Sequence, residues 1–169
     1  MALCLVKSLV ERQGFDPQDQ MHHYVPGMAM TDVYLVSCVG KKQPRAVAAR
    51  ELYLSDWFRK ARAYVEATGA PWFILSAEHG LLDPSTVISP YDRTLNAMSV
   101  ADRRAWAATV LDQLKEVLHE TDDVVIFAGQ RYRKFLLDGL RPMCRRVDVP
   151  LAGLGIGQQL QWFTQQQPR

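Results

Sequence analysis

Cysteine is scarce in this sequence: only three occur in 169 residues, at positions 4, 38 and 144. No C-x-x-C pair exists, so neither a zinc ribbon nor a disulfide framework is indicated, and a reducing cytoplasm is expected. No apolar run approaches the length of a membrane span, and the first residues lack the apolar core of a secretory signal. We therefore predict a cytoplasmic protein without a membrane partner or a metal site.

The chain also has little net charge, +2 in total, so its composition alone does not indicate a nucleic-acid partner. The Walker spacing is missing, which argues against ATP hydrolysis. A G-L-G-I-G run at 153–157 is superficially like a dinucleotide fingerprint. It lies at the end of the chain rather than after the first strand, and no acidic residue follows it, so NAD binding is disfavoured. We expect no cofactor.

Two regions follow from the pattern of the chain. Residues 1–30 are predicted to be an appendage, with apolar positions in 2–12 that favour a short amphipathic helix. Its predicted role is that of a docking helix or of an element that contacts a partner. Residues 31–169 alternate short apolar runs with helical periodicity, and that alternation is typical of crossover units and a parallel sheet. The predicted class is α/β, a three-layer sandwich with a four-stranded, mainly parallel sheet. The predicted strands are 33–37, 72–76, 123–128 and 146–149, and the main predicted helices are 51–68, 99–119 and 131–140.

One stretch, Leu75 to Asn96, is predicted to leave regular structure for about twenty residues, which is uncommon in a compact domain unless the loop is functional. Its apolar residues can anchor it to a core. It also holds a dense set of groups that move protons or form hydrogen bonds. Polar groups on anchored loops often carry chemistry, so we predict that the site is built around this stretch.

Each predicted strand ends in small or polar residues, and the ends of parallel strands meet at one edge of a sheet, where ligands bind. The loop after the first strand offers a glycine and two lysines, a suitable cradle for an anion or a polar base edge. Amides, carboxylates and an aromatic ring suit a planar heterocycle. The predicted substrate-binding residues are Ser37, Cys38, Gly40, Lys41, Lys42, Tyr91, Gln130, Tyr132 and Gln158.

Five motifs occur in order between Asp32 and about Trp162. They are V-S-C-V-G-K-K, A-A-R-E-L-Y-L-S-D-W-F-R-K-A-R, L-S-A-E-H-G-L-L-D-P with S-P-Y-D-R-T-L-N, F-A-G-Q-R-Y, and P-L-A-G-L-G-I-G-Q-Q-L. The set resembles a family of bacterial and phage domains of unknown function. That family is similar to the uracil-DNA glycosylase fold and to the base-handling domain of archaeosine synthase. The resemblance extends to phage-defence DNA glycosylases that remove glucosylated hydroxymethylcytosine, although the water-activating motif G-Q-D-P-Y is absent.

This resemblance implies a DNA glycosylase that acts on phage DNA. Cleavage of an N-glycosidic bond builds positive charge on the sugar, which a nearby carboxylate stabilises. Asp92 is the first choice for that carboxylate and Glu78 the reserve. His79, Lys42 or Asn96 supplies the donor to the departing base. Gln130 and Asn96 are expected to read base edges. The expected phosphate contacts are Lys41, Lys42, Arg131 and Arg133.

Two other functions fit the same residues. In the first, the protein is a transferase or hydrolase that acts on a free nucleotide or nucleoside, and binding would then be insensitive to salt. In the second, it is a DNA- or partner-binding module without catalysis, and Asp92 and Glu78 are helix caps. If biological activity survives replacement of both acids, the binding module is favoured over an enzyme.

Overall fold

The structure is a computed structural model that describes residues 31–38 and 40–166; the predicted appendage, residues 1–30, lies outside the described residues. Its centre is a five-stranded sheet in the order β4-β3-β1-β6-β7. The strands are β1 (Asp32–Ser37), β3 (Trp72–Ser76), β4 (Gly80–Leu82), β6 (Asp123–Phe127) and β7 (Arg146–Asp148). Four of them are parallel, and β4 alone is antiparallel.

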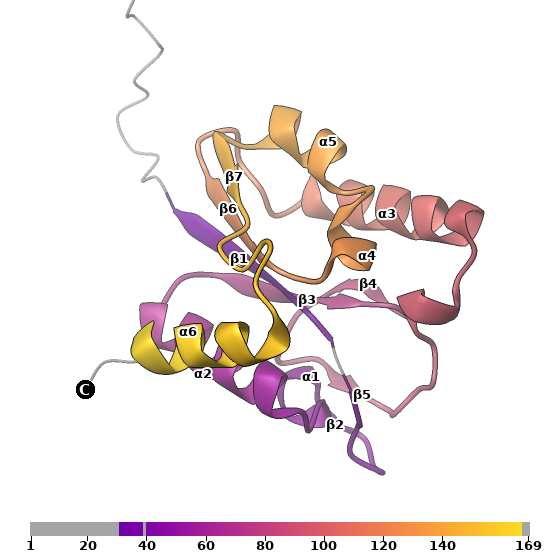
Figure 1. The fold of residues 1–169 in the computed structure, drawn as a ribbon. Coiled ribbons are helices and arrows are strands. Elements are labelled where there is room, and N and C mark those ends of the chain that lie inside the picture. Colours follow the sequence, from indigo (N-terminus) through magenta and orange to yellow (C-terminus); the bar gives the residue numbers. More distant parts are fainter. Residues whose placement is uncertain (1–30, 39, 167–169) are drawn as a thin grey trace, which may run out of the picture.

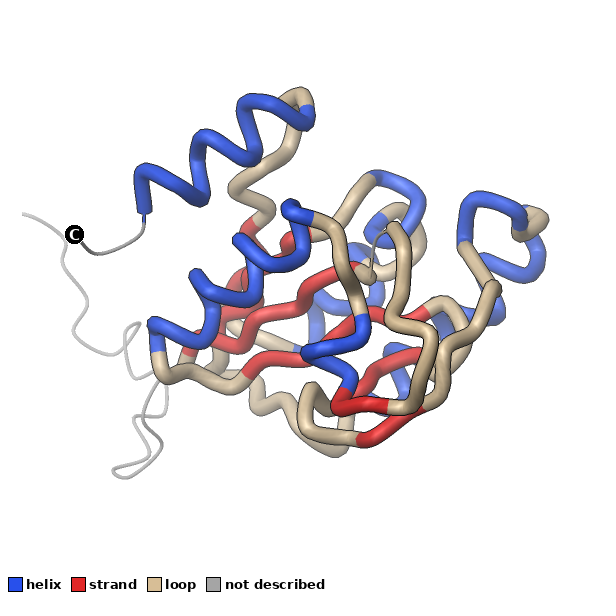
Figure 2. The backbone as a smooth tube through the Cα atoms, turned by 90° about the horizontal axis from the view of Figure 1, so that it is seen from below, coloured by secondary structure: helices blue, strands red, loops and turns tan. Residues whose placement is uncertain are grey.

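Helices cover both faces of this sheet. Helix α2 (Asp56–Thr68) and helix α6 (Ile156–Gln166) pack against each other on one face, as Figures 1 and 2 show. Helix α3 (Val100–Leu114) lies on the other face with the short helices α4 (Gln130–Arg133) and α5 (Leu137–Leu140). The chain is therefore a mixed α/β protein with a mostly parallel sheet, which confirms that part of the prediction.

Local sequence explains why the long helices begin and end where they do. The Ser55 hydroxyl accepts a hydrogen bond from the backbone N–H of Phe58 at 3.2 Å and caps α2. Gly69 ends that helix with a φ of 71°, a left-handed conformation that favours glycine. Ser99 and Asp102 form a complete capping box at the start of α3. The buried positions of α2 and α3 then face the sheet.

The predicted helix at 51–68 is wrong in its first turn. Helix α1 (Ala49–Leu52) ends at Leu52, and α2 begins only at Asp56. Between them the chain pairs with the loop after β1: the N–H of Leu54 donates to the Lys41 carbonyl at 2.8 Å, and Tyr53 forms a bridge with Lys42. Long-range backbone pairing and the burial of Tyr53 thus override local helical propensity.

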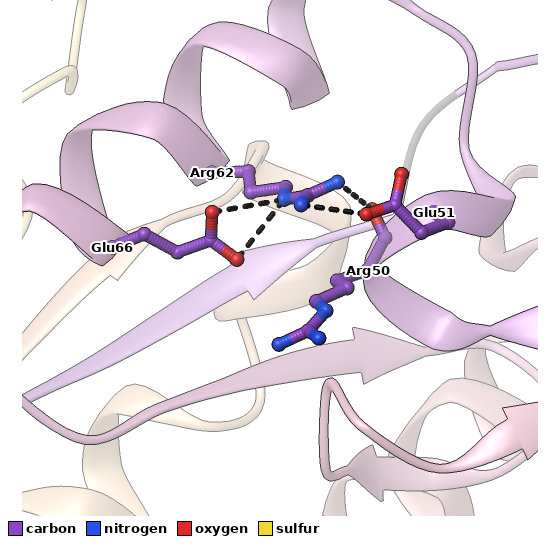
Figure 3. A network of polar contacts seen from close by, with 4 residues as sticks. All are labelled: Arg50, Glu51, Arg62 and Glu66. Carbon is purple, nitrogen blue, oxygen red and sulfur yellow. Dashed lines mark hydrogen bonds and ion pairs between the residues drawn. The ribbon is translucent and has the colours of Figure 1, made fainter.

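Arg62 holds the two halves of this broken helix together (Figure 3). Its guanidinium contacts the Glu51 carboxylate at 2.7 Å and the Glu66 carboxylate at 3.0 Å. It also donates to the backbone carbonyl of Arg50 at 3.0 Å. The hydrogen bond from Arg62 lowers the pKa of Glu51. The angle between α1 and α2 is thereby fixed by side chains of both helices.

The predicted irregular stretch, 75–96, contains more regular structure than its sequence indicates. Strand β4 pairs with β3, and β5 (Val87–Ile88) pairs with β2 (Val47–Ala48) in a separate two-stranded sheet. A 3₁₀ turn, η1 (Leu95–Ala97), follows. The four-strand prediction therefore missed β4, because a three-residue edge strand has too little periodicity to stand out.

The other element boundaries differ less. The predicted helix 131–140 is divided into α4 and α5, and a second 3₁₀ turn, η2 (Arg141–Met143), follows it. The predicted helix 99–119 ends at Leu114. None of the helices in residues 31–38 and 40–166 is long and apolar enough to cross a membrane.

Candidate functional site

The carboxyl ends of the central strands meet at one edge of the sheet, as predicted. Val36 of β1 lies beside Ile74 of β3 and Phe127 of β6, so the three strands end at nearly the same level. From β1 the chain first adds β3 on one side and later β6 on the other. The gap between β1 and β6 is therefore the topological switch point, where open α/β sheets bind ligands.

Tyr91 is the centre of a polar cluster at this edge. Its hydroxyl oxygen lies 2.8 Å from the Tyr53 hydroxyl and 2.8 Å from the Ser76 hydroxyl. It also donates to the Cys38 sulfur at 3.6 Å. One side chain of the long stretch is thus joined to the ends of β1 and β3 and to the break between α1 and α2.

Tyr132 closes the cluster from the side of α4. Its hydroxyl donates to the Cys38 carbonyl at 3.1 Å and lies 3.4 Å from the Cys38 sulfur. The ring of Trp106, from α3, meets the Tyr132 ring edge-on, and the Trp106 indole donates to the Ser76 carbonyl at 2.8 Å. Both faces of the sheet therefore contribute to a fixed arrangement of hydroxyl groups.

The tyrosines of the cluster remain protonated at neutral pH. Burial away from water, with the nearby Cys38 thiol as the next cause, raises the pKa of Tyr53, Tyr91 and Tyr132 above the ordinary value of tyrosine. Each hydroxyl therefore acts as a neutral hydrogen-bond donor or acceptor, and none supplies a negative charge to the site.

Two cationic or titratable side chains border this cluster. The Lys42 ammonium lies 4.3 Å from the centre of the Tyr91 ring and 6.0 Å from that of Tyr53, a cation–π arrangement. The His79 ring meets Tyr91 edge-on at 5.4 Å. The His79 backbone N–H donates to the Ser76 hydroxyl at 3.0 Å. These contacts place Lys42 and His79 against the same tyrosine ring.

A small central recess of about 70 Å³ opens over the polar cluster. It is lined by Cys38, Gly40, Lys42, Tyr53, Arg93, Thr94 and Tyr132. Gly40 has a φ of 83°, and a Cβ atom there would come within 3.2 Å of the Ser55 side chain, so a larger residue is strained at this position. The central recess admits a small part of a ligand beside an ammonium and several hydroxyl groups.

A second recess of about 240 Å³ lies beside the central one, at the turn between β3 and β4. Its polar lining includes Glu78, His79, Arg93 and Asp102. The Arg93 guanidinium contacts the Glu78 carboxylate at 3.7 Å, and Arg93 also lines the central recess. Arg93 thus links the Glu78 carboxylate to the central recess above the polar cluster.

A third, apolar recess of about 440 Å³ lies at the switch point between β1 and β6. Its lining is Ser37, Gly40, Ser55, Trp57, Gly129, Ile156, Gln159 and Leu160. The Gln159 carboxamide accepts from the Trp57 indole at 2.7 Å and donates to the Leu154 carbonyl at 2.7 Å. Gln159 therefore fixes the indole in the wall. Gly40 lines both this recess and the central one, and Arg93 lines the central and the second, so the three recesses follow one another in a row.

Comparison with known proteins places the chain in a family. The family of unknown function DUF6884 matches residues 33–165, nearly all of the described fold. The chain belongs to this family.

The chain is also similar to a bacterial protein. The uncharacterized protein YfjM of Bacillus subtilis (strain 168) is 30% identical over 145 residues, which cover 78% of this chain and 92% of that protein. No solved structure matches the chain. The region that the family model matches contains every recess of this DUF6884 protein that is described above.

Most of the predicted site residues are brought together by the fold. The residues that line a recess or join the polar cluster are Ser37, Cys38, Gly40, Lys42, Glu78, His79, Tyr91 and Tyr132. Gln130 lines a separate basic hollow beside α4.

Four predicted residues are outside these recesses. Asp92 is exposed and has no hydrogen-bond or ion-pair partner among the described residues. Lys41, Asn96 and Gln158 are also exposed. The Asn96 carbonyl accepts from Arg131 at 3.3 Å, and the Gln158 side chain caps the turn at Gly155. Their side chains thus have local or solvent-facing positions.

Three residues of the site are not predicted from the sequence: Tyr53, Trp57 and Gln159. Ser76, Arg93 and Thr94 lie in the predicted functional stretch, 75–96, but have no predicted role there. Tyr53 and Trp57 fall in a predicted continuous helix, where aromatic residues indicate a core. Ser76 had a usable signal, since it is the polar residue directly at a strand end. No group of three or more metal-ligating side chains is present in the described part of the chain.

Proposed function

We propose that this protein is a DNA glycosylase of the uracil-DNA glycosylase type, which hydrolyses the N-glycosidic bond of a modified base and leaves an abasic site. The motif resemblance points to glucosylated hydroxymethylcytosine in phage DNA as the substrate and to antiphage defence as the role. The observation that carries the proposal is the row of three recesses at the carboxyl edge. The first of these recesses has an apolar wall, the central one is rich in hydroxyl groups, and the last one contains the Glu78 carboxylate.

The apolar recess is the proposed place for the base, which must leave the DNA stack to react. Its volume of about 440 Å³ lies in the range of about 300–1,000 Å³ that is usual for small-molecule sites. Trp57 supplies apolar and aromatic surface in its wall. Backbone groups at Gly40 and Gly129 allow close approach to a polar base edge.

Glu78 is the proposed carboxylate for the sugar. As the bond to the base breaks, positive charge develops on the deoxyribose, and a fixed negative charge nearby stabilises that transition state. The Glu78 carboxylate contacts the guanidinium of Arg93 at 3.7 Å, and Arg93 lines the central recess. Asp92 lacks such a holding contact among the described residues, so the geometry favours Glu78 for this role.

Lys42 is the proposed donor to the departing base. Its side chain lines the central recess, between the apolar recess and Glu78. In the reaction, Lys42 gives a proton to the base as the bond from the sugar carbon to the base nitrogen breaks. Water adds its oxygen to that carbon, and the proton that the water loses replaces the one that Lys42 gave. The hydroxyl proton of Tyr132 is donated to the Cys38 carbonyl, so its neutral oxygen is available to accept a hydrogen bond from the water.

Two isosteric acid variants test this assignment. Duplex DNA with the modified base is incubated with wild type, Glu78→Gln and Asp92→Asn, and the rate of base release is measured under single turnover. We expect Glu78→Gln to slow release by about a hundredfold or more, because the charge partner of the transition state is removed. Asp92→Asn is the matched control and should stay close to wild type. A slow Asp92→Asn with a normal Glu78→Gln transfers the role to Asp92; normal rates in both leave the proposed mechanism without its carboxylate.

A further inference from the structure

Five cations come from α3, from α4 and from the residue after α4, and these two helices contact each other. We call Arg103, Arg104, Arg131, Arg133 and Lys134 the basic surface. Among the described residues, no carboxylate lies within ion-pair distance of any of them. The Nε atoms of Arg103 and Arg133 also have no hydrogen-bond partner among those residues. In a chain whose net charge is only +2, this is a local concentration of unneutralised positive charge.

One aromatic ring contacts two cations of the basic surface. The Arg104 guanidinium lies 5.3 Å from the centre of the Phe135 ring, and the Lys134 ammonium lies 5.5 Å from it. The two charges are therefore within about 11 Å of each other, close to the screening length of about 8 Å at physiological salt. Arg131 is tied to the Asn96 carbonyl at 3.3 Å. A bound polyanion would relieve the mutual repulsion of these cations.

The acidic residues nearest in the chain are engaged elsewhere. Asp102 caps α3 through Ser99. Asp112 contacts Lys115 at 3.0 Å, and Asp138 contacts Arg141 at 3.8 Å. The protein therefore does not neutralise the basic surface with these carboxylates.

A hollow of about 240 Å³ lies within the basic surface, lined by Arg103, Gln130, Arg131 and Lys134. Gln130 directly follows Gly129, which lines the apolar recess at the switch point. Asp102, next to Arg103, lines the recess that contains Glu78. The basic hollow is thus adjacent in the chain to both ends of the row of recesses.

We infer that the basic surface holds the phosphodiester backbone of the strand whose base enters the apolar recess, an inference that rests on the proposed function. Guanidinium groups bind phosphate oxygens in pairs, and a glutamine amide adds a neutral donor. An anionic membrane is the less suitable partner, because membrane association also needs an apolar face. Only Val87, Val100 and Ile156 are large exposed apolar residues in the described chain, and only Val100 belongs to α3.

The DNA path then differs from the one that the sequence indicates. The sequence favours Lys41 and Lys42 as phosphate contacts together with Arg131 and Arg133. Lys42 instead faces the Tyr91 ring in the polar cluster. The inferred contacts to the DNA phosphates come from α3, α4 and the residue after α4. Arg103, Arg104 and Lys134 are contacts that the sequence did not predict.

A charge-matched pair of triple variants tests the basic surface. The test variant is Arg104→Gln, Arg131→Gln and Lys134→Gln. The control is Arg59→Gln, Lys115→Gln and Arg141→Gln, which removes the same charge from exposed ion pairs elsewhere. Binding to a labelled, unmodified 20-base-pair duplex is measured from 50 to 300 mM NaCl, and folding is checked by circular dichroism. Each phosphate interaction that a substitution removes lowers the slope of log K against log salt by about 0.9.

We expect the slope of the test variant to fall by roughly two to three units and the control variant to keep the wild-type slope. Equal slopes in both variants, or no binding of duplex or single-stranded DNA by the wild type, overturn the inference. Weaker binding of the test variant to phosphatidylserine vesicles with unchanged DNA binding also overturns it. If the triple variant does not fold, Lys134→Gln alone must lower the slope by about one unit.

The inference about the basic surface and the proposed glycosylase function can fail independently. DNA binding through the basic surface by a wild-type protein that releases no base supports this inference and contradicts the glycosylase proposal. Base release by the wild type, together with a wild-type salt slope in the test variant, supports the glycosylase proposal and contradicts this inference.

Discussion

Tyr91 is the residue on which the polar cluster depends. It comes from the stretch that the sequence marks as functional, and its hydroxyl joins Tyr53, Ser76 and Cys38. The sequence places Tyr91 in a polar, proline-flanked segment and so identifies it as a site residue. It does not identify Tyr53 as the partner, because the two are 38 positions apart and meet only through the break between α1 and α2.

Removal of the Tyr91 hydroxyl tests its structural role. Tyr91→Phe keeps the ring next to Lys42 and His79 but leaves the buried Tyr53 and Ser76 hydroxyls without that partner. We expect the free energy of unfolding to fall by about 1–2 kcal/mol, the usual cost of unpaired buried groups. Urea unfolding measures it.

A double-mutant cycle supplies the control. Ser76→Ala removes the same hydrogen bond from the other side, so the two effects should be less than additive in the combined variant. An unchanged urea midpoint for Tyr91→Phe, or strict additivity with Ser76→Ala, would show that the hydroxyl pair contributes nothing.

At the scale of elements, strong local signals produce correct predictions and long-range pairing produces the errors. The strands β1, β3 and β6 are predicted from short apolar runs, β7 from the segment R-V-D-V, and the start of α3 from its capping box. The break after α1 and the strands β4 and β5 depend on partners elsewhere in the chain, such as the pairing of β5 with β2. Propensity and periodicity contain no information about such partners.

The capping box of α3 allows a prediction for a whole element. Ser99→Ala removes the hydroxyl that accepts from the Asp102 N–H at 3.1 Å. We expect the free energy of unfolding to fall by about 1 kcal/mol. Ser89→Ala is the matched control, because Ser89 is exposed and has no hydrogen-bond partner among the described residues; its effect should stay within about 0.5 kcal/mol. Equal effects of the two substitutions would contradict the account of how α3 begins.

At the scale of the whole molecule, the candidate site is a consequence of topology. Parallel strands make it possible to predict that Cys38, Glu78 and Gln130 lie at one edge. The sequence does not reveal the apolar recess, because its walls come from α2 and α6, which are about a hundred residues apart and meet only in the fold. The hydrogen bond from Trp57 in α2 to Gln159 in α6 is one of the contacts between these two helices. The roles of Trp57 and Gln159 are therefore beyond the reach of any local pattern.

Base release by this protein is measured as the formation of abasic sites in phage DNA. Wild-type protein is incubated without added metal with DNA that contains glucosylated hydroxymethylcytosine and with the same DNA containing unmodified cytosine, and abasic sites are counted with an aldehyde-reactive probe. We expect abasic sites that increase with time in the glucosylated DNA only, with release of one intact modified base for each site. If the glucosylated DNA gains no abasic sites at a protein concentration that saturates binding, the protein is not a glycosylase for this base.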